Sequence, residues 1–360
     1  GSHMVHRKLI IDTDCGGDDA IAIMLAMTQP DVEVIAITVV WGNVEVNQGM
    51  ENIGKLLDLY DADIPFFRGA EGPLVGERET VQWGGFGSDG FGDAGFPPSQ
   101  RVALQPKRHA ALEILKILEE AEPSDDVVYQ LVALGPLTNV ALALRLNPDL
   151  FSKLGTDTIP GIVIMNGTSE SKGNSNMAAE FNSHCDPEAG VVVLQHKGWK
   201  CPVQLVNWEV TVNSPMTWGF YDKLVNREST PNGRVAVNQN KWQEFIEKLF
   251  QRLEAFTRIH DDGTRADTGD AEATQDVTCV VPDAVAVLVA IRPESVLDSF
   301  LTYVTVELHG RETRGATCID WYGTEQSMAK KGRWRNCNVI TKVDNEMFLK
   351  ALRDIVEYVA

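Results

Sequence analysis

The segment KLIIDTDCGGDD, residues 8–19, begins with an apolar run and ends in a cluster of aspartates. The apolar run has the length and composition of a buried strand, and residues 18–28 carry apolar side chains at helical spacing. Between these two parts, Gly16 and Gly17 permit a tight turn. The segment therefore predicts a strand, an acidic loop and a helix, in that order.

The same succession of strand and helix is repeated along the chain. Apolar, strand-like runs occupy residues 32–40, 127–134, 158–165 and 203–206, and helical periodicity marks residues 46–59, 138–146 and 187–195. Regular alternation of this kind is typical of an α/β fold with a mostly parallel, doubly wound sheet and helices on both faces.

The last third of the chain has a different pattern. A long helix is expected at residues 239–260, a polar acidic loop at 261–276 and another helix at 283–290. Residues 300–307, 316–320 and 339–341 alternate like the strands of a small C-terminal antiparallel appendage, before a closing helix at 345–359. No internal repeat or linker-like stretch separates these parts, so we expect residues 5–360 to form a single domain. Residues 1–4 are an expression-tag scar.

The composition restricts the classes of partner. The 360 residues include 32 Lys and Arg against 51 Asp and Glu, and the net charge of −19 repels a phosphate backbone. No apolar run approaches the roughly twenty residues of a membrane span. The six cysteines are dispersed without a CxxC pair, which favours reduced thiols. We therefore expect a soluble, cytoplasmic protein with neither a nucleic acid nor a membrane as partner.

Four carboxylates are crowded into the first loop. Asp12, Asp14, Asp18 and Asp19 repel one another, and a divalent cation would relieve that repulsion. Hard oxygen ligands favour calcium or magnesium over zinc. Asp18 and Asp19 also suit the N-terminal cap of the following helix, but capping does not account for the other two acids. The loop therefore predicts a metal site.

Polar residues also follow the later strands, and in a doubly wound sheet ligands bind beyond the carboxyl ends of the strands. Amides and a carboxylate are suitable partners for the hydroxyl groups of a sugar, although each residue alone also fits a turn or a helix cap. The candidates are Asn43 in W-G-N, Thr138 in G-P-L-T-N, Met165 in M-N-G, Asn174, Glu180 and Asn182 in GNSNMAAEFN, and Asp283 in V-V-P-D.

Residues 83–98, WGGFGSDGFGDAGFPP, combine six glycines with interleaved aromatic side chains. Such a composition fits a flexible surface loop. It fits equally well a lid whose aromatic side chains cover a ring-shaped ligand. The sequence leaves both interpretations open.

Several motifs occur together in one order: D-T-D-x-G-x-D-D, G-P-L-T-N, N-x-x-x-x-x-E-F-N leading into D-P-E-A, and a late Pro-Asp. In this combination the chain resembles the inosine-uridine-preferring nucleoside hydrolase family over nearly its whole length. The resemblance implies that family's fold and calcium-dependent hydrolysis of the bond between ribose and a nucleobase. It also implies a homodimer or homotetramer.

The resemblance further implies a role for individual residues around the metal. Calcium would be held by Asp14, Asp19, the carbonyl of Thr138, and Asp283. Asp14 would also take the proton of the attacking water, and Asp12 would support the site from behind. Calcium lowers the pKa of a bound water and fixes its position, so Asp14 needs only modest basicity.

For the ribose, the resemblance implies that Asp18 and Asn182 grip the two lower hydroxyls with the help of Asn43. Asn174 and Glu180 would hold the hydroxymethyl end, with Met165 also at the substrate. Carboxylates close to the sugar would stabilise its oxocarbenium character as the bond to the base breaks.

The chain departs from the family pattern where the base would bind. Many members carry a His just before the last metal-binding Asp and another His before a Gly in the lid, but here these positions are Pro282 and Phe86. A purine can be protonated on its ring and leave without a nearby acid, which predicts purine nucleosides, inosine or guanosine, as substrates in purine salvage. The candidates for the base pocket are Trp83, Phe86 and Phe91 for stacking, and His260, beside Asp261, as an acid.

Two other functions remain open from the residues alone. A haloacid-dehalogenase-type magnesium phosphatase also begins with D-x-D after its first strand, with Asp12 then a nucleophile and Asp14 an acid or base. The later Gly-Gly-Asp-Asp and E-F-N motifs fit that class poorly. A non-catalytic calcium- or ribose-binding module is the other alternative.

Overall fold

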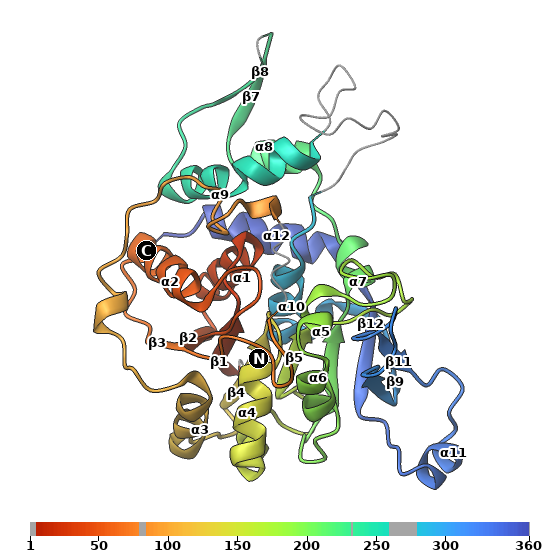
Figure 1. Ribbon diagram of the computed structural model, residues 1–360. Helices are drawn as coiled ribbons and strands as arrows, with labels where there is room; N and C mark the ends of the chain where they lie inside the picture. Colours follow the sequence, from red (N-terminus) through yellow and green to blue (C-terminus); the bar gives the residue numbers. More distant parts are fainter. Residues whose placement is uncertain (1–4, 79–83, 232, 259–278, 360) are drawn as a thin grey trace.

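The computed structural model describes residues 5–78, 84–231, 233–258 and 279–359. A central eight-stranded sheet has the order β3-β2-β1-β4-β5-β6-β12-β9 (Figure 1). All neighbouring strands in it are parallel except β12 and β9. The strands are β1 (His6–Thr13), β2 (Val32–Val39), β3 (Phe66–Arg68), β4 (Val127–Ala133), β5 (Ile162–Met165), β6 (Val203–Val206), β9 (Val296–Thr302) and β12 (Cys337–Val343). The expected α/β fold with a mostly parallel sheet is confirmed.

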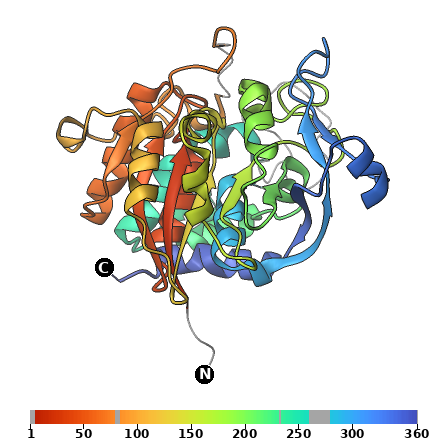
Figure 2. The same ribbon diagram turned by 90° about the horizontal axis from the view of Figure 1, so that it is seen from below.

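Helices cover both faces of the sheet (Figures 1 and 2). One apolar core lies between the sheet and α1 (Gly17–Met27), α2 (Val46–Tyr60), α10 (Pro282–Ile291) and α12 (Asn345–Val356). A second core lies on the opposite face, under α3 (Ala110–Glu120), α4 (Thr138–Leu146) and α6 (Pro187–Leu194). Because both faces of the sheet are covered, the strands carry apolar side chains on both faces. They therefore appear as continuous apolar runs in the sequence.

The strand order 3-2-1-4-5-6 reverses its direction between β1 and β4. The strands β2 and β3 lie on one side of β1, and β4, β5 and β6 lie on the other side. The loops that follow β1 and β4 therefore run in opposite directions and leave a crevice at the carboxyl ends of these two strands. The acidic loop follows β1, and Thr138 begins α4 directly after β4. The topology therefore brings together motifs that are more than a hundred residues apart.

The expected antiparallel appendage near the C-terminus is present, but it contains only some of the strands that were assigned to it. Residues 300–307 divide between β9, at the edge of the main sheet, and β10 (Val304–Val306), which pairs with β11 (Thr317–Ile319) as a separate antiparallel ladder. Residues 339–341 belong to β12, which lies inside the main sheet between β6 and β9. Local alternation cannot distinguish these cases, because the pairing partner of a strand is set by the whole topology.

A group of elements lies above α1 and α2 in the view of Figure 1. It consists of α8 (Trp218–Leu224), the hairpin of β7 (Arg227–Thr230) and β8 (Gly233–Ala236), and α9 (Lys241–Thr257). The expected helix at 239–260 corresponds to α9, which begins after the cap residue Asn240. The expected acidic loop at 261–276 lies outside the described residues. The remaining helices are α5 (Phe181–Cys185), α7 (Trp208–Val212) and α11 (Glu325–Lys330).

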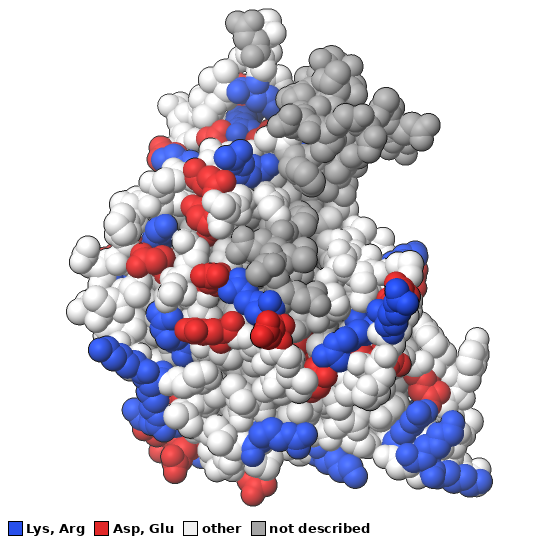
Figure 3. Space-filling view, viewed as in Figure 1, with Lys and Arg blue, Asp and Glu red and all other residues white. Residues whose placement is uncertain are grey.

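Basic and acidic side chains are interspersed on the face shown in Figure 3. The ion pairs of the protein include that between Arg101 and Asp58. Among the described helices, none combines the length and the apolar character needed to cross a membrane.

Candidate active site

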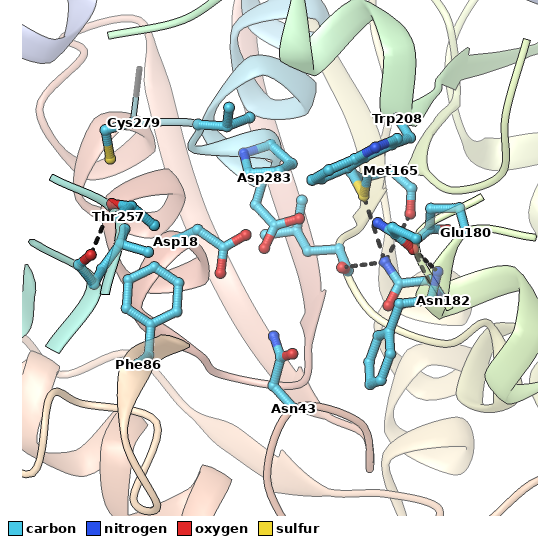
Figure 4. A pocket seen from close by; sticks show the side chains of 16 residues that line it. Asp18, Asn43, Phe86, Met165, Glu180, Asn182, Trp208, Thr257, Cys279 and Asp283 are labelled. Atoms are coloured by element: carbon cyan, nitrogen blue, oxygen red, sulfur yellow. Dashed lines mark hydrogen bonds between the residues drawn. The ribbon is translucent and has the colours of Figure 1, made fainter. Parts of the chain in front are cut away.

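A cavity of about 290 Å³ opens at the carboxyl ends of the central strands (Figure 4). Asp18 and Asp283 lie at its centre in this view, with Asn43 facing them. Phe86, Thr257 and Cys279 lie to one side, and Met165, Glu180 and Asn182 lie to the other. The other lining residues are Leu134, Asn174, Phe181, Trp208, Leu253, Val280 and Pro282.

The acidic loop after β1 is held by hydrogen bonds to its own carboxylates. Asp19 accepts hydrogen bonds from the hydroxyl of Thr13 and, at 3.0 Å, from the amide of Gly16. The amide of Asn43 donates to Oδ2 of Asp14 at 2.7 Å. Gly42 permits this approach, because a Cβ atom there would lie 2.2 Å from Asp14 Oδ2. The loop is thus fixed with its carboxylates turned toward one another.

Asp12 lies beneath this loop, at the end of β1. Its Oδ1 accepts hydrogen bonds from Thr38 Oγ1 at 2.6 Å and from Asn139 Nδ2 at 2.8 Å. These bonds tie the ends of β1 and β2 to the start of α4. Both bonds fall on one oxygen of a fully buried side chain, so the position of Asp12 fits a supporting role.

Buried carboxylates meet at the centre of the cavity. Asp18, Asp19 and Asp283 each offer an oxygen, and these oxygens lie within 4.8 Å of one another. Burial, together with the charges of the neighbouring aspartates, raises the pKa of Asp18 to about 7 and that of Asp283 well above its usual value. Burial, followed by the charge of Asp19, also raises the pKa of Asp14. The ionised cluster needs a compensating positive charge.

A divalent metal ion fits these residues. Oδ1 of Asp14 and Oδ2 of Asp12 are buried and have no hydrogen-bond partner. An unsatisfied buried carboxylate oxygen is costly unless a cation or donor meets it. The atoms of this cluster that could coordinate a metal ion are carboxylate oxygens, which suit a hard cation. The sequence placed these acids in one site, and the structure brings Asp14, Asp18, Asp19 and Asp283 together.

Thr138 is buried behind the acidic loop. Its hydroxyl donates to Oδ2 of Asp186 at 2.7 Å and accepts from Nε1 of Trp41 at 3.2 Å. Sequence reasoning did not single out Asp186 or Trp41. The aspartate of D-P-E-A was available as a signal, but an Asp before Pro at a helix start also fits the cap that Asp186 provides for α6. Thr138 itself is therefore rigidly placed next to the cluster.

We call Met165, Asn174, Glu180 and Asn182 the polar end of the cavity. Nδ2 of Asn182 donates to the carbonyls of Leu134, at 2.9 Å, and of Met165, at 3.0 Å, as Figure 4 shows. Glu180 caps α5 and accepts from the amides of Asn182 and Gly167 at 2.7 and 2.8 Å. Burial raises the pKa of Glu180 to about 7.

Asn174 completes the polar end and differs from its neighbours in being exposed. Its Oδ1 accepts from the amide of Phe181 at 2.8 Å. The structure therefore brings all four predicted residues of this end to one wall of the cavity.

We call Phe86, Leu253, Thr257, Cys279 and Val280 the apolar end. The Phe86 ring packs edge-on against Phe250 at 5.6 Å between centroids. It also lies directly on Gly17, where a Cβ atom would come within 2.3 Å of the ring. The hydroxyl of Thr257 is used within its own helix, donating to the carbonyl of Leu253 at 2.7 Å. None of these five described residues is a histidine or a carboxylic acid.

The described part of the glycine-rich segment is anchored to the body of the protein. Asn52 Nδ2 donates to the carbonyl of Asp89 at 2.8 Å and to that of Cys15 at 3.1 Å. Gln251 donates to the carbonyl of Gly92, and Arg252 pairs with Asp93. This part of the segment is thus a fixed wall that presents Phe86 to the cavity.

The other residues expected in the base pocket have different positions. Phe91 does not line the cavity. It is fully buried against Phe96 and Phe245, because Gly90 and Gly92 turn the chain inward, both at positive φ. Trp83 and His260 lie outside the described residues. Trp208, at the start of α7, lines the cavity and was missed, since its only sequence signal was a place just after a strand.

Comparison with known proteins places these features in context. The family model described as "Inosine-uridine preferring nucleoside hydrolase" matches residues 9–350. "Pyrimidine-specific ribonucleoside hydrolase RihA" of Escherichia coli (strain K12) is 31% identical over 357 residues, which cover 98% of this chain and 99% of that protein. "Uridine nucleosidase 1" of Arabidopsis thaliana is 38% identical over 190 residues, 52% of this chain and 53% of its own.

Solved structures agree with this match. A structure described as "Inosine-Guanosine Nucleoside Hydrolase (IG-NH)" is 95% identical, covers 99% of this chain and 100% of its own, and superposes with a TM-score of 0.93. The "Purine-Preferring Ribonucleoside Hydrolase from Gardnerella vaginalis" shares the fold, with a TM-score of 0.74 at 24% identity over 97% of this chain and 98% of its own.

Proposed function

The chain belongs to the inosine-uridine preferring nucleoside hydrolase family, and from this premise we propose that it hydrolyses purine nucleosides, inosine and guanosine, with calcium as its metal ion. Hydrolysis of nucleosides follows from the family. The choice of purines rests on the 95% identity with the inosine-guanosine nucleoside hydrolase. The apolar end of the cavity has no histidine or carboxylic acid among its five described residues, and the family resemblance would place a histidine at Phe86 and at Pro282; both points support the same choice.

We assign the metal to Asp14, Asp19, the carbonyl of Thr138, and Asp283. The buried, unpartnered Oδ1 of Asp14 and the contact of Asp283 with Asp18 and Asp19 support this assignment. A calcium ion held there would supply positive charge that lowers the pKa of water in the site. Calcium accepts such a set of carboxylate and carbonyl oxygens in flexible geometry.

Asp14 is proposed as the base that takes the proton of the attacking water. Its Oδ2 is fixed by the amide of Asn43, and its Oδ1 has no protein partner. Burial and the charge of Asp19 raise its pKa in the metal-free fold, and the positive charge of a bound calcium would act in the opposite direction. Asp12 would hold the loop in place from beneath.

The ribose is proposed to lie between Asp18 and the polar end. Asp18, Asn43 and Asn182 would bind the two lower hydroxyls, and Asn174 and Glu180 would bind the hydroxymethyl group, next to Met165. The aspartates beneath the ring would also stabilise the positive charge that develops on the sugar as its bond to the base breaks.

The base would then occupy the apolar end. A purine bound there can be protonated on its ring and leave without a protein acid, whereas a pyrimidine is a poor leaving group in the same place. Phe86 lines this end and offers an aromatic side chain to the base. Trp83 as a second stacking residue and His260 as an acid remain predictions, as does a homodimer or homotetramer.

The two alternative functions lack comparable support. A phosphatase would use Asp12 as nucleophile, yet Asp12 is fully buried beneath the loop, where Thr38 and Asn139 hold its Oδ1. A binding module without catalysis is at odds with the intact set of acids in a hydrolase family.

The deciding experiment measures release of free base and ribose from inosine, guanosine, adenosine, uridine and cytidine without phosphate, before and after chelation. Cleavage of inosine and guanosine that chelation abolishes and calcium restores would support the proposal. Uridine cleaved as efficiently as inosine would overturn the purine preference, and restoration by magnesium but not calcium would overturn the choice of metal.

A further inference from the structure

The loop between β5 and α5, residues 166–180, carries the polar end of the cavity and is held by a carboxylate outside it. Glu209, on α7, is buried and accepts three backbone hydrogen bonds from one turn of this loop. Its Oε2 accepts from the amide of Ser169 at 2.7 Å, and its Oε1 from those of Glu170 and Lys172 at 2.9 and 3.2 Å.

Within the described residues, the other hydrogen bonds and ion pairs of residues 169–172 are the bond of the Ser169 hydroxyl to the same carboxylate and the ion pair of Glu170 with Lys172. The side chains of Glu170, Ser171 and Lys172 are exposed, so packing does not hold the turn in place. Ser171 has a φ of 59°, a left-handed conformation that costs energy for a residue other than glycine. The bonds to Glu209 therefore outweigh an unfavourable backbone geometry, and without them the turn would relax toward ordinary conformations.

Both ends of the loop connect the turn to the cavity. Before the turn, the carbonyl of Gly167 accepts from the amide of Trp208, and its amide donates to Glu180 at 2.8 Å. After the turn, the amide of Asn174 donates to the carbonyl of Ala179 at 3.1 Å. A shift of the turn would consequently move Asn174 and Glu180.

We propose that Glu209 is a positioning residue that sets this loop so that Asn174 and Glu180 meet the 5′-hydroxyl of the ribose. The inference rests on the ribose contacts proposed above. Glu209 does not line the cavity and contacts no substrate; it acts through the turn. A carboxylate is required because it is an acceptor at both oxygens, whereas the amide of a glutamine would direct N–H groups at backbone N–H groups.

The test separates positioning from general stability by changing the substrate. Inosine and 5′-deoxyinosine are compared by kcat/KM in the wild type and in Glu209→Gln and Glu209→Ala variants. We expect both variants to lose roughly tenfold or more in kcat/KM for inosine, but less than about threefold for 5′-deoxyinosine, because that substrate lacks the group that the loop positions. Glu170→Gln, in the same turn but with an exposed side chain paired with Lys172, serves as the control and should retain wild-type values.

The possible results distinguish the role of Glu209 from the ribose contacts proposed for Asn174 and Glu180. If the wild type does not discriminate between the two substrates, the 5′-hydroxyl contacts of Asn174 and Glu180 are wrong. If the wild type discriminates and the Glu209 variants discriminate equally well, the role of Glu209 is wrong. Should Glu209→Ala fail to fold, Glu209→Gln carries the test, and its melting temperature and its rate on 5′-deoxyinosine show that it is folded. Equal losses on both substrates would assign Glu209 a purely structural role and overturn the inference.

Discussion

The polar and apolar ends of the cavity are fixed by different forces. At the polar end, Glu180 and Asn182 each make several hydrogen bonds to backbone atoms, so their positions are set by directional contacts. At the apolar end, Phe86 is held by ring packing on Phe250 and by close contact with Gly17. Hydrogen bonds restrict position and angle narrowly, whereas apolar packing tolerates changes of shape.

This difference suits the two halves of a nucleoside. The ribose is common to every ribonucleoside, and the base differs. Relatives named for pyrimidine and for purine nucleosides occur in the same family, as the 31% identical and 95% identical proteins show. We therefore expect substitutions at the centre and the polar end to affect all nucleosides alike, and those at the apolar end to change their ranking.

The largest expected effect comes from the acids between the two ends. Asp14→Asn removes the proposed base and one carboxylate of the metal site while keeping the shape of the side chain. We expect kcat to fall by about 10³-fold or more for inosine and uridine alike, measured by release of free base. Asp61→Asn, at an exposed side chain just after the end of α2, is the control. A variant with more than a tenth of the wild-type kcat would exclude Asp14 as the base.

Removal of the metal should also lower the activity on every substrate. The stability that the metal provides should depend on pH, because the acids of the site titrate. Burial raises the pKa of Asp12 and of Asp18 to about 7 in the metal-free fold, above the 3.8 expected for the unfolded chain. The metal-free protein therefore holds protons that the unfolded chain has lost, and its stability falls as the pH rises from about 4 through 7. Calcium binds the ionised acids, so its stabilising effect grows over the same range.

We accordingly expect chelation to lower kcat/KM by about 100-fold or more at pH 8. At a hundredfold excess over its dissociation constant, calcium should stabilise the fold by about 2.7 kcal/mol at pH 8 and by much less at pH 5. Thermal unfolding with and without calcium at both pH values measures this difference. A calcium effect that is equal at pH 5 and pH 8 would contradict the assignment.

A smaller, uniform effect is expected at the polar end. Asn182→Ala removes a proposed ribose contact and leaves the carbonyls of Leu134 and Met165 without their donor. We expect kcat/KM to fall by roughly 10- to 100-fold for inosine and uridine by the same factor. If the two factors differed by more than threefold, the division between the ends of the cavity would be wrong.

The smallest effect is expected at the apolar end, where only the ranking should change. Phe86→Leu should lower kcat/KM for inosine by roughly 3- to 10-fold through loss of the aromatic contact, with little change for uridine. Phe91→Leu is a matched control, because Phe91 lies in the same segment but is buried in the core. That control should lower the free energy of unfolding by about 1 kcal/mol and leave the inosine-to-uridine ratio unchanged.

Much of the fold and of the central site could be predicted from the sequence. The alternation of apolar runs and helical periodicity is a local property, so β1, β2, β4 and their helices were expected close to their observed bounds. Asp14, Asp18 and Asp19 are near neighbours in one loop, and their convergence needs only a tight turn. Asn43 and Asn182 were expected at the site because parallel strands end at one edge of a sheet, and Asp283, at the start of α10, was expected there from the family resemblance.

Only the tertiary structure decided which of the other residues line the cavity and which support it from the core. Phe86 and Phe91 lie five residues apart in one glycine-rich segment, yet one lines the cavity and the other packs in the core. Their difference depends on α9, whose Phe245 and Phe250 come from a distant part of the chain. In the same way, the role of Glu209 depends on β5 and β6 lying side by side. Local patterns encode the backbone, but the partners of a buried side chain are set by the packing of elements distant in sequence, which no local pattern contains.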